Sequence, residues 1–118
     1  MEANVDVDAR ARASKAVSHM REAAQSMIDR LQFDVQFAGD VIAALNREQT
    51  VSEGMRGLDM PGVRLGLTEA ISRLESARLE ARRHLFRAMV DEGLSIGDVA
   101  RTWGISRQLA SRILREAG

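Results

Sequence analysis

Apolar residues recur at steps of three and four along the first part of the chain, between about residues 9 and 47. This spacing places them on one side of an α-helix and predicts a long helix with a heptad-like seam. The seam consists of Ala13, Val17, Met20, Ala24, Met27, Leu31, Val35, Ala38, Ile42 and Leu45. We expect residues 1–8 to form a flexible N-terminus, in which Asp6 or Asp8 caps the helix.

The pattern leaves two points about this helix open. Gly39 lies inside it, and because glycine in a helix costs about 1 kcal/mol relative to alanine, a break or kink there is one outcome. The seam packs either against a second copy or against its own chain. We favour dimerisation, for a reason that lies in the C-terminal segment of the chain. The predicted dimerisation residues are Val17, Met20, Ala24, Met27, Leu31, Val35, Ile42 and Leu45.

Glycines and the single proline gather in the middle of the chain, over about residues 50–66. Gly and Pro interrupt helices and strands, so this segment is predicted to be a connecting loop. It lacks the glycine and lysine spacing of a phosphate-binding P-loop. A flexible connection between two long helices is the expectation that remains.

A second long helix is predicted from Thr68, a suitable N-cap residue, to a stop at Gly93. We expect its first half to pack on the N-terminal helix and its second half to cover the C-terminal segment. Its apolar stripe consists of Ile71, Leu74, Ala77 or Arg78, Ala81, Leu85, Ala88 and Met89.

The C-terminal segment is predicted to form two short helices joined by a tight turn. Ser95 and Asp98 have the spacing of a capping box, which marks a helix start. Gly104 ends this helix, because glycine tolerates the positive φ of a turn, and Ser106 can cap the next one. One continuous helix would leave Gly104 in its interior without benefit.

Residues 96–115 resemble the helix-turn-helix of bacterial regulators, and the second helix is similar to those of sigma-factor region 4, resolvase-type and repressor-type domains. The resemblance covers only this end of the chain and implies that residues 81–118 form a tri-helical DNA-binding module. The helical periodicity of the rest predicts an all-α protein, in which residues 9–80 are a helical dimerisation region. Dimerisation is favoured because two copies of a small DNA-binding module bind two half-sites. The motif core would consist of Val99, Ala100, Trp103, Gly104, Ile105, Ala110 and Ile113.

In such proteins the second helix enters the DNA major groove. The resemblance therefore implies base contacts from Arg107, Gln108, Ser111 and Arg112, and phosphate contacts from Arg101, Ser106 and Arg115. The charge distribution agrees with this, because residues 81–118 hold seven arginines against four carboxylates whereas the whole chain has a net charge of zero.

Other chemistry has little support in the sequence. The chain has no cysteine, and His19 and His84 are far apart in sequence without a metal-binding spacing. No serine-nucleophile motif is present. We therefore expect no enzyme activity, no metal, no cofactor and no membrane span.

The predicted function is that of a dimeric, sequence-specific transcriptional regulator that binds double-stranded DNA. The alternative is an architectural DNA-bridging or adaptor protein, whose acidic N-terminal helices recruit a protein partner. Either function implies a cytoplasmic, nucleoid-associated location.

Overall fold

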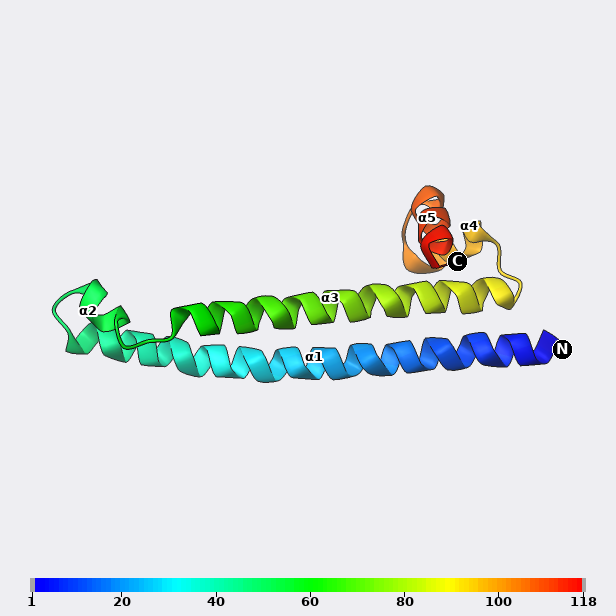
Figure 1. The fold of residues 1–118 in the computed structure, drawn as a ribbon. Helices are drawn as coiled ribbons and strands as arrows, with labels where there is room; N and C mark the ends of the chain where they lie inside the picture. The colour runs from blue at the N-terminus through cyan, green and yellow to red at the C-terminus, as the bar shows by residue number, and fades with distance from the viewer. Residues whose placement is uncertain (1, 118) are drawn as a thin grey trace. The chain divides into compact units, whose positions relative to one another are not determined.

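Residues 2–117 are described by a computed structural model, in which they form five α-helices and no strand (Figure 1). The predicted all-α class is confirmed. The helices are α1 (Glu2–Arg47), α2 (Val51–Met55), α3 (Met60–Asp91), α4 (Ile96–Trp103) and α5 (Arg107–Ala117).

Helix α1 is longer than predicted. It begins at Glu2, so residues 2–8 continue the helix and neither Asp6 nor Asp8 stands at its N-terminal end. It also continues through Gly39 without a break. Each residue added to an existing helix gains a backbone hydrogen bond, and one glycine costs too little to interrupt so long a run.

The predicted loop over residues 50–66 is wrong in extent. Thr50 caps the short helix α2 by accepting a hydrogen bond from the Glu53 backbone N–H at 3.1 Å. Helix α3 then begins at Met60. Pro61 suits a first helical turn, since the N–H that it lacks would have no partner there.

The start of α3 has a cap that sequence reading missed. Asp59 Oδ1 accepts the Gly62 N–H at 3.1 Å, the role that we expected of Thr68. Thr68 lies inside the helix instead, where its hydroxyl donates to the Arg64 carbonyl at 3.0 Å. The C-terminal end of α3 matches the prediction, because Gly93 follows it with φ of 103° and the Leu94 N–H bonds back to the Met89 carbonyl at 3.1 Å.

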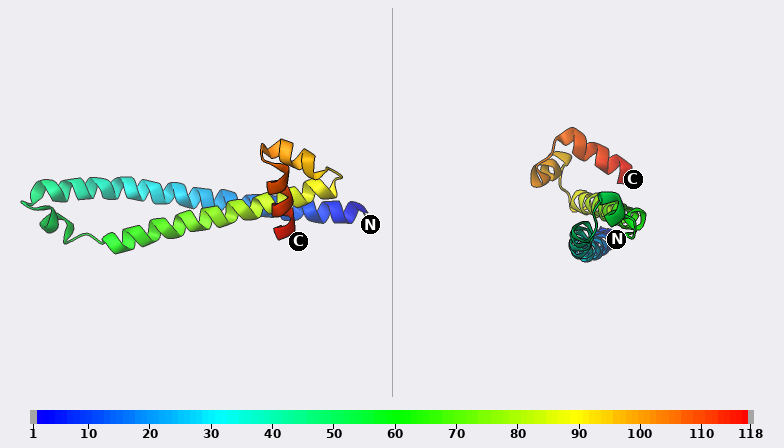
Figure 2. Two further views of the ribbon diagram at one scale, coloured as in Figure 1. Left: turned by 90° about the horizontal axis from the view of Figure 1, so that it is seen from above. Right: turned by 90° about the vertical axis from the view of Figure 1, so that its left-hand side faces the viewer.

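The chain forms two compact units, to which α1 and α3 both contribute. The first unit contains residues 1–21 and 75–118, and the second unit contains residues 22–74. Within each unit, the segments of α1 and α3 lie side by side and run in opposite directions (Figure 1, Figure 2).

In the second unit, α1 turns one regular stripe of residues toward its own chain. This inner stripe follows alternating steps of four and three, and all of its members are buried or half-buried: Ala23, Met27, Arg30, Asp34, Phe37, Val41 and Ala44. On α3, Val63, Leu67, Ala70 and Leu74 are likewise buried or half-buried. Arg30 Nη2 joins the two helices by donating to the Val63 carbonyl at 2.6 Å.

The predicted seam therefore mixes two stripes of α1. Met27 belongs to the inner stripe, whereas Leu31, Val35, Ile42 and Leu45 lie one residue beyond it and are exposed. The exposed fraction reaches 75% at Val35 and 60% at Ile42. The inner stripe was missed because it contains the charged Arg30 and Asp34, which pair with each other at 3.2 Å.

In the first unit, α1 and α3 meet through small side chains. Ala9 and Ala13 of α1 pack with Ala88 of α3, and the half-buried Leu85 lies against them. Alanine allows two helix axes to approach at the short end of the usual 8–10 Å range. Val17 and Met20, two predicted dimerisation residues, are half-buried in this unit.

Candidate nucleic-acid interface

Helix α4 begins at the predicted capping box. Ser95 Oγ accepts the Asp98 N–H at 3.1 Å, and Asp98 Oδ2 accepts the Ser95 N–H at 3.1 Å. Hydrogen bonds that Ser95 donates to the Asp98 carboxyl, with the nearby Arg101 guanidinium, hold the pKa of that carboxyl below its ordinary value. The start of α4 is thus specified by its own first residues.

The turn between α4 and α5 depends on the backbone of Gly104. Its φ of 67° and ψ of 35° are left-handed, and it is one of two glycines with positive φ among the described residues. A Cβ built on Gly104 would meet no atom within 4 Å. Glycine is therefore favoured here by conformation rather than by lack of space.

Both ends of α5 are held by hydrogen bonds. At its start, Ser106 Oγ accepts the Leu109 N–H at 3.0 Å, as its predicted role as a cap requires. Near its end, Arg87 Nη2 of α3 donates to the Leu114 carbonyl at 3.3 Å. The Ser106 bond defines where α5 begins, and the Arg87 bond ties its last turns to α3.

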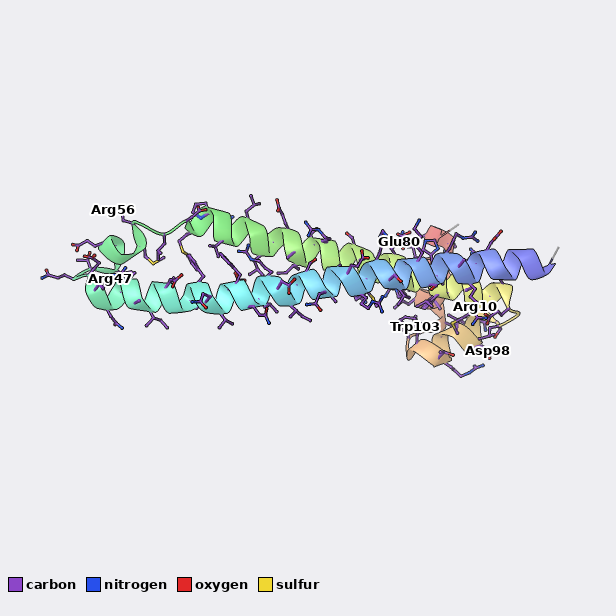
Figure 3. The ribbon with its side chains drawn as sticks, turned by 90° about the horizontal axis from the view of Figure 1, so that it is seen from below. Arg10, Arg47, Arg56, Glu80, Asp98 and Trp103 are labelled. Carbon is purple, nitrogen blue, oxygen red and sulfur yellow. The ribbon has the colours of Figure 1, made fainter. Side chains whose placement is uncertain are left out.

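The inner faces of α4 and α5 share one apolar core with the end of α3. Its buried members are Phe86, Val99, Ala100, Ala110, Ile113 and Leu114. Four of them were predicted from the sequence, and the half-buried Ile105 packs against them. Trp103 departs from the prediction, because it lies at the rim of this core with an exposed fraction of 39% (Figure 3).

Phe86 is the main core residue that sequence reading missed, although no part of it is exposed. It lies outside the α3 stripe that packs on α1. A second apolar face, formed by Phe86, Met89 and Val90 at steps of three and four, carried the signal. The end of α3 is therefore apolar on two sides, one for α1 and one for α4 and α5.

The outer face of α5 is polar and hollowed. Among the residues that line one surface hollow are Ser106, Arg107, Gln108, Ser111, Arg112 and Arg115. These are six of the seven predicted DNA contacts, and all come from α5 or its cap. Ser111 is half-buried and the others are exposed.

The outer face of α5 keeps the positive charge of its arginines. Within the described part of the chain, no ion pair involves Arg107, Arg112 or Arg115. Arg101, the seventh predicted contact, instead pairs with Asp98 and lies on α4 outside the hollow. The α5 face therefore presents unneutralised positive charge, and Arg101 is a weaker candidate.

The two histidines lie closer in space than the sequence suggested. His19 and His84 line the same hollow of the first unit, where His84 Nε2 lies 3.0 Å from Glu80 Oε1. Even so, residues 2–117 show no group of three side chains that could hold a metal ion. No helix in that range is long and apolar enough to cross a membrane.

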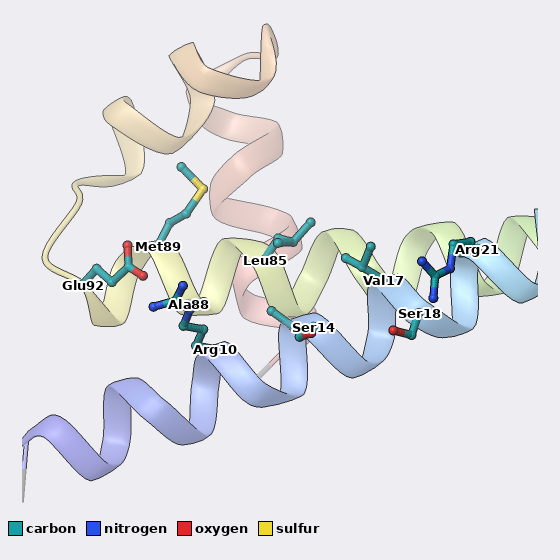
Figure 4. A pocket seen from close by; sticks show the side chains of 10 residues that line it. Arg10, Ser14, Val17, Ser18, Arg21, Leu85, Ala88, Met89 and Glu92 are labelled. Carbon is teal, nitrogen blue, oxygen red and sulfur yellow. The ribbon is translucent and has the colours of Figure 1, made fainter.

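A second groove of the first unit is mainly apolar. Val17, Leu85 and Met89 contribute its apolar lining, and Arg10 and Arg21 stand on the α1 side (Figure 4). Glu92 of the segment after α3 also lines it. No family model, curated protein or solved structure matches the chain.

Proposed function

We propose that α5 binds double-stranded DNA in the major groove and that the protein is a sequence-specific transcriptional regulator. The observation that carries the proposal is the division of α5 into two faces. Its inner face is anchored to α4 and α3 by Ala110 and Ile113, which are at most 1% exposed. Its outer face groups arginine, glutamine and serine side chains, and no ion pair among the described residues neutralises these arginines.

The side chains of the outer face suit the edges of base pairs. Arg107 and Arg112 can each donate two hydrogen bonds to a guanine, and Gln108 can pair with an adenine in the same manner. Each such contact discriminates against a wrong base by about 1–3 kcal/mol. An anchored helix keeps these side chains in a fixed register, which a flexible basic tail does not do.

The start of α5 suits the phosphate backbone. The Ser106 oxygen accepts the Leu109 N–H, which leaves the hydroxyl hydrogen free to donate to a phosphate oxygen. The N-terminal end of a helix also has a partial positive charge that favours anions. Arg115, exposed on the same face, adds a further charge near the other end of α5.

An architectural or adaptor function is the second candidate, and one observation favours it. The second unit exposes large apolar side chains on α1, including Leu31 and Ile42. Large exposed apolar patches usually mark contacts with another protein. Under this alternative α5 holds DNA with little sequence preference, while the second unit recruits a partner.

Selection from random DNA separates the two candidates. The full chain is incubated with random duplexes at about 50 and 200 mM salt, binding is followed by fluorescence anisotropy, and the bound fraction is sequenced. A regulator enriches a defined sequence. Binding without enrichment supports the architectural function, and absence of binding at both salt concentrations overturns the assignment of α5 to DNA.

A pair of arginine variants tests whether α5 is the contact. Arg112→Ala removes one side chain of the outer face, and Arg73→Ala removes the same charge from an exposed position of α3 in the second unit. We expect a loss of about 5-fold or more in affinity for the selected site with Arg112→Ala. Equal losses for both variants would contradict a specific role of α5.

A further inference from the structure

Helix α1 carries a second heptad stripe beside the one that packs on its own chain. This outer stripe has alternating steps of four and three, and every member is apolar: Ala24, Ile28, Leu31, Val35, Ala38, Ile42 and Leu45. Its large members are exposed, from 37% at Leu45 to 75% at Val35. Ile28, Leu31, Val35, Ala38 and Ile42 are all exposed, whereas Ala24 is half-buried and Leu45 also lies next to Gly54 of α2.

The surroundings of the outer stripe suit another helix. The heptad position next to it on the side away from the inner stripe holds the uncharged Gln25, Gln32, Gly39 and Asn46, and Asp29 lies farther round the helix. A Cβ on Gly39 would meet nothing within 4 Å, so no contact within the described chain accounts for glycine in the middle of this helix. A strict heptad of apolar residues is the pattern with which one helix packs on another.

We propose that the outer stripe binds a second copy of the same stripe in antiparallel orientation, about a two-fold axis near Val35. When two identical helices pack antiparallel about a two-fold axis, the numbers of any two residues that face each other add up to the same total. With that sum near 69–70, Leu31 lies opposite Ala38 and Ala24 lies opposite Leu45. The two alanines each meet a leucine, while Ile28 meets Ile42 and Val35 meets its own counterpart near the axis.

The charges at the ends of the stripe support the same register. Arg21 is exposed at the next heptad position before Ala24, and Glu48 is exposed just after α1, where its N–H still bonds to the Ala44 carbonyl at 3.2 Å. The antiparallel register places Arg21 of one copy near Glu48 of the other, twice in each dimer. A parallel register would instead place like charges together at both ends.

This inference names the partner of the proposed DNA-binding protein, but it rests on α1 rather than on α5. Its first test compares Val35→Glu with Gln36→Glu, which adds the same charge at the neighbouring exposed position outside the stripe. We expect Val35→Glu to be monomeric and Gln36→Glu dimeric by light scattering, with unchanged helicity by circular dichroism. A monomeric parent chain, or a dimer that persists in Val35→Glu, would overturn the proposal.

A charge exchange tests the antiparallel register. Arg21→Glu and Glu48→Arg should each weaken the dimer several-fold in sedimentation equilibrium, because each places like charges opposite each other. The double variant should recover the parent dissociation constant. A double variant that dimerises no more tightly than the single variants contradicts this register. DNA binding is tested separately: a monomeric Val35→Glu chain that still binds the selected sequence shows that the function of α5 does not depend on this dimer.

Discussion

The ring of Trp103 in α4 meets the ring of Phe86 in α3 edge to face, with centroids 5.1 Å apart and planes inclined by 67°. Phe86 is fully buried, whereas Trp103 keeps 39% of its surface exposed. Trp103 is the only tryptophan of the chain. Its fluorescence therefore reports whether α4 remains packed on α3, which makes it a probe for several of the predictions below.

Phe86→Ala should destabilise the first unit by about 3–5 kcal/mol, the usual cost of removing a fully buried aromatic ring. Denaturant unfolding followed by Trp103 fluorescence measures the change. Leu65→Ala is the control, because Leu65 is largely exposed in the second unit. A similar, small effect of both substitutions would show that Phe86 is not central to the core.

Gly104→Ala should cost about 1–2 kcal/mol from backbone conformation alone, since a Cβ there meets no neighbouring atom. Gly104→Val should cost more, because a β-branched residue resists positive φ, and Gly104→Asn should cost least. Thermal unfolding of the three variants gives this order directly. Equal melting temperatures would contradict the left-handed turn.

The capping box predicts a pH dependence of stability at the start of α4. Hydrogen bonds from Ser95 lower the pKa of Asp98 in the folded state. The ionised Asp98 carboxylate therefore contributes fully to folding stability at pH values above the ordinary aspartate pKa. This contribution is lost as pH falls through the lowered value. Asp98→Asn should be less stable at neutral pH, and its stability should fall less steeply as the pH is lowered. Acid unfolding followed by Trp103 fluorescence measures both effects, and an unchanged acid unfolding curve would refute the role of the carboxylate.

Arg115→Ala should make DNA binding less sensitive to salt. If Arg115 contacts a phosphate, its loss lowers the slope of log affinity against log salt by about 1 and weakens binding about equally on all sequences. Arg101→Ala serves for comparison and should change the slope less, because Arg101 is paired with Asp98. Anisotropy titrations over a series of salt concentrations give both slopes.

Sequence reading succeeded where structure is set by nearby residues. The capping box of Ser95, the turn at Gly104 and the cap at Ser106 involve groups within a few positions of one another. The cap of α3 at Asp59 was not predicted, because the glycines and the proline that follow it suggested a loop. Pro61 lies in the first turn of α3, where it favours a helix.

The sequence by itself determined the helical class, the short helices α4 and α5 and the polar residues of the outer α5 face, because these follow from periodicity and local hydrogen bonds. Only the tertiary structure decided which stripe of α1 is inside. Two adjacent stripes have heptad spacing, and the buried one contains Arg30 and Asp34 while the more apolar one is exposed. The Arg30–Asp34 pair is local, but burial of this stripe also depends on the approach of α3 and on the hydrogen bond from Arg30 to the Val63 carbonyl. That bond joins residues 33 positions apart, which no local pattern encodes.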